Sequence, residues 1–127
     1  MKLTIPFYLH KVGAGFPSPA TDYIEDDIDL NSHLITNAPA TFIIRVQGKS
    51  MMNVGIYDGD LLIVDKSMDP RNFSTVIANV NEELVVKTFV KGNENNYLNS
   101  GKNKIELSEN PNVIIWGVVT YVIHKFH

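Results

Sequence analysis

Short apolar runs dominate the chain from residue 41 onward, and turn-forming residues separate them. The runs are rich in valine, isoleucine, threonine and aromatic residues, which favour extended structure. They cover residues 41–46, 61–64, 75–80, 83–90 and 113–123. The connections between these runs contain no long stretch with the apolar periodicity of a helix. The pattern therefore predicts a compact, mostly β domain built from short, mainly antiparallel strands.

The connections between these runs carry the turn signals. Glycine, asparagine, aspartate and proline gather at residues 53–59, 69–72, 81–82 and 92–101. Such residues favour turns because they tolerate tight or left-handed backbone geometry. We interpret the asparagine-rich stretch 92–104 as an exposed hairpin connection. A short helical turn is predicted over residues 31–36, with Asp29 or Asn31 as its N-cap.

The first 30 residues differ in composition from the rest of the chain. Four residues that break regular structure lie close together: Gly13, Gly15, Pro17 and Pro19. Five acidic residues follow between Asp22 and Asp29. We therefore predict a flexible N-terminal arm over residues 1–30 and a β domain over residues 31–127. The acidic cluster is interpreted as a solvated face, with a docking site for a basic partner as the alternative.

Composition and charge narrow the possible chemistry. The 127 residues fit one domain, and 44% of them are hydrophobic, which suffices for a packed core. A formal net charge of -3 provides no basic field for phosphates, so direct nucleic-acid binding is not expected. The sequence contains no cysteine, which removes disulfides, thiolate zinc sites and cysteine nucleophiles. We expect no metal and no cofactor, and the remaining chemistry belongs to serine, lysine, histidine and carboxylates.

The N-terminus superficially imitates a secretory signal. Lys2 precedes an apolar run at residues 3–9, but that run is short, contains Pro6, and ends at His10 and Lys11. A signal sequence needs a longer uninterrupted apolar stretch. No later run approaches the roughly 18 apolar residues of a membrane-spanning helix. We therefore expect a cytoplasmic protein without a membrane segment.

One serine stands at a position where a nucleophile could be exposed. Ser50 lies in VQGKSMMNVGIYDGDLLIVD, between a strand-like run and a turn rich in glycine and aspartate. A serine hydroxyl is a poor nucleophile unless a base removes its proton. The histidines of the chain are His10, His33, His124 and His127. None of them forms a recognisable serine, histidine and aspartate pattern, so a lysine base is the alternative to test.

Lys87 is the lysine whose surroundings suit that role. Strand alternation over residues 83–90 puts Val85, Lys87 and Phe89 on one face, and both faces of the strand are largely apolar. A lysine acts as a base only when neutral, and burial favours the neutral amine. The alternative is an edge-strand lysine whose stem snorkels to solvent. Lys49 is less suitable, because neighbouring residues on an extended chain project to opposite sides.

Three motifs at matching separations resemble the self-processing serine/lysine peptidases of the LexA and UmuD family. The turn Gly48-Lys-Ser-Met is similar to the Gly-x-Ser-Met box of that family. The run GIYDGDLLIV at residues 55–64 is similar to its Gly-Ile-x-Asp-Gly-Asp segment, and Val-Val-Lys at residues 85–87 to its Val-Lys strand. Lys87 follows Ser50 by 37 residues, which also matches. The resemblance implies a LexA/signal-peptidase-like β domain with Ser50 as nucleophile and Lys87 as base.

The resemblance extends upstream to a cleavage region. The segment AGFPSPATDY at residues 14–23 resembles the region that UmuD-type members of the family cleave in themselves. The corresponding bond here is Ala14–Gly15, and the product is residues 15–127. Repressors of the family carry a helix-turn-helix domain before this site, whereas only 14 residues precede it here. We therefore expect a UmuD-like chain. Backbone N–H groups of Lys49 and Ser50 are candidates for the oxyanion hole, since a tight turn can aim them at developing charge.

The resemblance also implies a biological setting. It implies self-cleavage stimulated by a RecA filament on single-stranded DNA during the SOS response. It further implies a homodimer whose processed form joins a UmuC-like, error-prone translesion DNA polymerase as an accessory subunit. Cleavage within one chain and between two chains are both open. Two other functions also remain open: a non-catalytic dimeric module that binds the polymerase or RecA, and a peptidase that acts in trans on a related repressor.

Two positions depart from the family pattern. Phe73-Ser-Thr-Val76 stands where relatives often have Gly-Asp-Ile-Val, and Lys49 replaces an Asp or Met before the serine. The first departure concerns the geometry of a turn. The second concerns local charge, with possible effects on rate or substrate docking. Neither removes a proposed catalytic residue.

Overall fold

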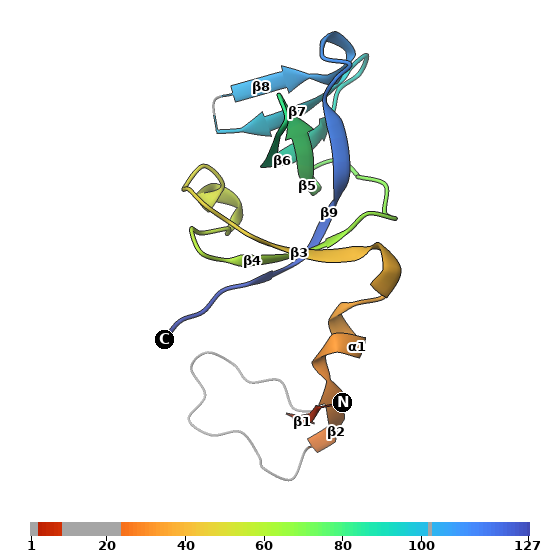
Figure 1. Ribbon diagram of the computed structural model, residues 1–127, viewed down its shortest axis with the longest axis vertical. Helices are drawn as coiled ribbons and strands as arrows, with labels where there is room; N and C mark the ends of the chain where they lie inside the picture. Colours follow the sequence, from red (N-terminus) through yellow and green to blue (C-terminus); the bar gives the residue numbers. More distant parts are fainter. Residues whose placement is uncertain (1–2, 9–23, 102) are drawn as a thin grey trace. The chain divides into compact units, whose positions relative to one another are not determined.

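The computed structural model describes residues 3–8, 24–101 and 103–127 (Figure 1). The chain divides into two compact units, Met1–Thr36 and Asn37–His127. The predicted cleavage bond Ala14–Gly15 lies outside the described residues. Each unit is therefore considered by itself, and the predicted active-site residues all fall in the second.

The first unit contains two strands that the sequence did not predict. Strand β1 (Thr4–Tyr8) pairs antiparallel with β2 (Ile24–Asp29). Helix α1 (Leu30–Leu34) follows directly, and its N-cap is Asp29, whose carboxylate accepts the N–H of Asn31 at 3.1 Å. The predicted helical turn and its Asp29 cap are thus confirmed. In the described ranges, no helix has the length and apolar character needed to cross a membrane.

The second unit is a seven-stranded antiparallel sheet (Figure 1). Its strands are β3 (Thr41–Arg45), β4 (Leu61–Asp65), β5 (Thr75–Val80), β6 (Glu83–Lys91), β7 (Asn96–Ser100), β8 (Asn103–Glu106) and β9 (Ile114–Ile123). Three short 3₁₀ turns lie between them: η1 (Ala38–Ala40), η2 (Met52–Val54) and η3 (Leu107–Glu109). The strand order across the sheet is β3-β4-β9-β5-β6-β7-β8. The mostly β, antiparallel fold predicted from the sequence is confirmed.

The asparagine-rich stretch 92–104 was wrongly interpreted as an exposed connection. It contains β7 and the start of β8, which pair with each other, and β7 also pairs with β6. Leu98 is fully buried and Ser100 is 7% exposed. The error has a physical cause. The asparagines signal a turn locally, whereas cross-strand pairing with β6 and the burial of one leucine decide the conformation.

Two buried clusters form the core of the second unit. The first core cluster consists of Val46, Met51, Ile56, Leu62, Val64 and Ile77. The second core cluster consists of Val76, Ala78, Phe89, Leu98 and Val118. Consecutive residues of β5 join different clusters because side chains alternate across a strand. Strands β5 and β6 therefore lie between two apolar layers, which explains why both of their faces are apolar in sequence.

Phe73 keeps the turn geometry that the family's glycine would adopt. Its φ of 68° is in the left-handed region, which favours glycine. The Phe73 N–H donates to the Phe89 carbonyl at 2.7 Å, and the Phe89 N–H donates to the Ser74 carbonyl at 2.8 Å. These bonds continue the β5–β6 pairing beyond the end of β5. The departure at this position therefore changes the residue without disrupting the local pairing.

The β5–β6 hairpin offers a test of the backbone geometry. Its two loop residues, Asn81 and Glu82, have φ values of 51° and 67°, and the flanking Val80 and Glu83 pair directly. Such a two-residue loop prefers Asn-Gly, and a left-handed residue other than glycine costs about 1–2 kcal/mol. We expect Glu82→Gly to stabilise the protein by about 1 kcal/mol in urea unfolding. Glu83→Gly, in the strand, should destabilise the protein. A Glu83→Gly protein that is more stable than Glu82→Gly would contradict the turn assignment.

Candidate active site

Ser50 stands on an exposed turn that is anchored in the core at both ends. Residues 47–50 form this turn, here called the serine turn. Val46 before it is 7% exposed and Met51 after it is 3% exposed, and both belong to the first core cluster. Two buried side chains thus fix the ends of a four-residue loop. The turn therefore presents the Ser50 side chain at the surface, and the position of the turn is fixed by its two buried ends.

Backbone hydrogen bonds tie this region to the loop that follows. The Val46 N–H donates to the Asp60 carbonyl, and the Gly59 N–H donates to the Val46 carbonyl, both at 2.8 Å. Within the turn, Gly48 has a φ of 102°, and its N–H donates to Asp58 Oδ1 at 2.8 Å. The positive φ explains why glycine occupies this position. The Asp58-Gly-Asp60 segment is therefore a direct neighbour of the serine turn.

The backbone donors closest to the nucleophile make no hydrogen bond to another described residue. In the part of the chain that the structure describes, neither the N–H of Lys49 nor that of Ser50 donates a hydrogen bond. An exposed N–H at a turn is available to water or to a substrate oxygen. Free donors beside a nucleophile are what an oxyanion hole requires. The geometry is thus compatible with the pair of donors predicted from sequence.

Lys87 occupies the middle of β6 between the two apolar layers. Its neighbour Val86 packs against the first core cluster, whereas Val85 packs against the second, to which Phe89 belongs. Lys87 itself is half-buried and is paired with Val76 across the ladder. The alternation predicted from sequence is confirmed. The Lys87 stem thus extends from a strand whose neighbouring side chains pack against both core clusters.

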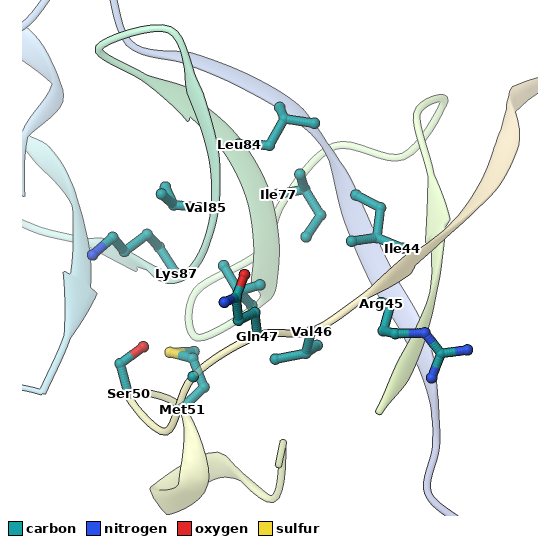
Figure 2. Close-up of a pocket in the computed structure, with 12 residues that line it drawn as sticks. Ile44, Arg45, Val46, Gln47, Ser50, Met51, Ile77, Leu84, Val85 and Lys87 are labelled. Carbon is teal, nitrogen blue, oxygen red and sulfur yellow. The ribbon is translucent and has the colours of Figure 1, made fainter. Parts of the chain in front are cut away.

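Ser50 and Lys87 line the same pocket, which has a volume of about 330 Å³ (Figure 2). The other lining residues come from β3, the serine turn and the two residues that flank it, β5 and β6: Ile44, Arg45, Val46, Gln47, Gly48, Met51, Ile77, Leu84, Val85 and Val86. The Lys87 amine is not directed at the Ser50 hydroxyl in Figure 2. No hydrogen bond joins these two side chains in the described structure. Catalytic hydrogen bonds often form only when substrate is bound, so this arrangement is compatible with a dyad.

Strand β6 has an open edge beside this pocket. Its pairing with β7 begins only at Thr88, whereas its pairing with β5 extends back to Glu83. Residues 83–87 therefore have a strand on one side and, among the described residues, none on the other. An open edge can accept an extended peptide as an additional strand. The pocket thus provides a backbone surface for substrate as well as reactive side chains.

Asp60 and His124 form an interaction that sequence reasoning missed. Asp60 is only 2% exposed, and its carboxylate accepts the Tyr57 N–H at 2.8 Å and contacts His124 Nδ1 at 2.5 Å. The Tyr57 N–H is the main cause of a lowered Asp60 pKa; burial acts in the opposite direction, and His124 adds to the lowering. His124 thus supports the loop after the serine turn. Across the described ranges, no group of three or more histidine and carboxylate side chains is placed to hold a metal ion.

Comparisons with known proteins identify the family of this chain. The profile of the Peptidase S24-like family matches residues 6–120. The chain is 39% identical to Protein ImpA of Salmonella typhimurium over 128 residues, covering 94% of this chain and 83% of the relative. It is 37% identical to Protein MucA of Escherichia coli over 122 residues, covering 93% and 83%.

A repressor of the same group is also similar, but over less of its own length. The LexA repressor of Pasteurella multocida is 32% identical over 120 residues, which cover 91% of this chain and 56% of the repressor. The family match spans both Ser50 and Lys87. Together these similarities confirm the resemblance drawn from the three motifs. The chain therefore belongs to the Peptidase S24-like family and is a UmuD-like member of it.

Proposed function

We propose that this protein cleaves its own Ala14–Gly15 bond with Ser50 as nucleophile and Lys87 as general base. One observation carries the proposal: Ser50 and Lys87 lie 37 residues apart in sequence and line one pocket. Membership of a peptidase family supports the reaction class. The N–H groups of Lys49 and Ser50 donate to no other described residue, which supports their role as oxyanion donors.

The chemistry proceeds in two steps. In the first, the neutral Lys87 amine takes the proton of the Ser50 hydroxyl, and the serine oxygen attacks the carbonyl carbon of Ala14. The N–H groups of Lys49 and Ser50 donate to the resulting oxyanion. The bond to Gly15 then breaks, and the Lys87 ammonium protonates the leaving amine. In the second step, Lys87 takes a proton from water, whose oxygen attacks the ester carbonyl. The bond to the Ser50 oxygen then breaks, the Lys87 ammonium returns a proton to that oxygen, and the new Ala14 carboxyl group is released and loses its proton to solvent.

The open edge of β6 supplies a docking mode for the cleavage segment. An extended segment around Ala14–Gly15 would pair with residues 83–87 and bring its carbonyl between Ser50 and Lys87. Alanine and glycine suit a narrow site because neither has a bulky side chain. From Gly15 to Asp29, about 14 extended residues span roughly 46 Å. We propose residues 1–30 as the cleavable arm of a domain over residues 31–127, acting within one chain or across a dimer.

The biological role follows from the UmuD-like assignment. We propose that a RecA filament on single-stranded DNA favours the state in which the arm occupies the pocket, which is a population shift between docked and undocked arms. The product, residues 15–127, would act in the SOS response as a homodimer. It would serve as the accessory subunit of a UmuC-like translesion polymerase. The net charge of -3 supports contact with DNA through protein partners.

The test is a time course of intact mass at neutral pH, with and without RecA, ATP and single-stranded DNA. The proposal predicts loss of residues 1–14, with at least a severalfold higher rate when the filament is present. Omitting ATP provides the matched control, because it leaves every protein component in place. A rate that is independent of the filament would contradict the proposed regulation. Failure to cleave under any of these conditions would contradict the peptidase function itself.

A further inference from the structure

Between its two anchored ends, the serine turn is hydrogen-bonded by one described side chain. Among the described residues, the only side-chain hydrogen bond to residues 47–50 is that from the Gly48 N–H to Asp58 Oδ1. The turn makes one further backbone bond, from the Met52 N–H to the Lys49 carbonyl at 3.3 Å. Its four residues are exposed, so packing contributes little within the turn. Val46 and Met51 therefore fix the ends of the turn, and Asp58 is the described side chain that fixes its path between them by a hydrogen bond.

The hydrogen bond to Asp58 holds Gly48, whose backbone angles set the direction of the N–H groups of Lys49 and Ser50. Gly48 has a φ of 102°, a conformation that an unrestrained chain leaves readily because glycine has many alternatives. Holding its N–H fixes the peptide plane at the start of the turn. The next two N–H groups, those of Lys49 and Ser50, are the unused donors beside the nucleophile. Their direction depends on the Gly48 backbone angles.

Asp58 is itself placed by a well-anchored loop. Ile56 is 2% exposed and belongs to the first core cluster. On the other side, Gly59 and Asp60 bond to the backbone of Val46, and the Asp60 carboxylate accepts the Tyr57 N–H. The carboxylate of Asp58 thus extends from a loop with fixed ends. A charged acceptor also makes a stronger bond to an N–H than a neutral one does.

We propose that Asp58 is a positioning residue for the cleavage reaction. Its carboxylate holds the Gly48 N–H and thereby aims the N–H groups of Lys49 and Ser50 at the oxygen that becomes negative. Asp58 does not touch the reacting atoms. This role rests on the proposed self-cleavage, and it adds a residue outside the Ser50 and Lys87 pair. Substitution of Asp58 should therefore change the rate of bond cleavage more than the stability of the fold.

The first experiment measures self-cleavage of the full chain over a range of alkaline pH. Asp58→Ala should lower the maximal first-order rate by about 10- to 100-fold, as expected for loss of a hydrogen bond to a charged group. The rate should fall by a similar factor at every pH in the range, because the base is retained. Asp58→Asn keeps an oxygen acceptor and should cleave within about threefold of the unaltered chain. Asp69→Ala changes another exposed loop aspartate and should have no effect.

A second measurement examines the turn without relying on cleavage. In the Ser50→Ala background, amide hydrogen exchange followed by NMR should show faster exchange of the Gly48 N–H after Asp58→Ala, and near-normal exchange after Asp58→Asn. Cleavage at the unaltered rate in Asp58→Ala, or unchanged Gly48 exchange, would overturn the positioning role alone. An unaltered chain that never cleaves would instead overturn the proposed function and, with it, this role.

Discussion

Lys87→Ala is expected to lower the rate of self-cleavage at Ala14–Gly15 by about 10²- to 10⁴-fold, the usual contribution of a general base. The alanine variant keeps the Ser50 hydroxyl but has no group in the pocket that takes its proton. The fold should persist, because Lys87 is half-buried and its removal leaves the two core clusters intact. The measurement is the first-order rate of product formation by intact mass.

Two comparisons make this result specific to the dyad. Lys91→Ala removes an exposed lysine from the end of the same strand and should leave the rate unchanged. Ser50→Ala should abolish cleavage, and the double variant should be no slower than Ser50→Ala alone, because the two groups act as a unit. A Lys87→Ala protein that cleaves at the unaltered rate would show that another base serves Ser50.

Met51→Ala is expected to destabilise the protein by about 2–5 kcal/mol, the usual loss when a buried methionine becomes alanine. Met51 is 3% exposed and belongs to the first core cluster directly after Ser50. Its removal leaves a cavity under the serine turn. The loss should appear in urea unfolding as a lower midpoint with little change in slope.

The next residue provides a matched control. Met52 is 45% exposed, so Met52→Ala should change stability by about 0.5 kcal/mol or less. Because Met51 anchors one end of the serine turn, its alanine variant should also cleave more slowly under conditions where it remains folded. Equal unfolding midpoints for the two variants would show that the turn is not anchored through Met51.

The parts of the fold that could be predicted are those where burial alone decides the conformation. The apolar runs that became β3, β4, β5, β6 and β9 carry enough valine and isoleucine to indicate strands from their own composition. Strands β7 and β8 carry few such residues and depend on pairing with β6. Strand β2 has the acidic sequence IEDDID and is extended through its pairing with β1. Pairing between distant segments is not visible in local sequence.

The same distinction applies to the site. Ser50 and Lys87 could be identified because a motif and a misplaced charge mark them in the sequence, and the fold brings both to one pocket. Asp58 lies in the GIYDGD motif, but the motif does not show which group its carboxylate contacts, and His124 lies in no motif. The bond of Asp58 to Gly48 spans a turn, and that of His124 to Asp60 spans 64 residues. Both depend on how the loop after Ser50 folds back, which only the three-dimensional structure shows.

The most direct test of the central claim identifies the bond that is cut. The unaltered and Ser50→Ala chains are incubated in parallel at alkaline pH, which favours the neutral form of an amine base, and their products are examined by intact mass. Self-cleavage by Ser50 predicts one large product, residues 15–127 beginning at Gly15, from the unaltered chain alone. A product with another N-terminus, or the same product from Ser50→Ala, would contradict it.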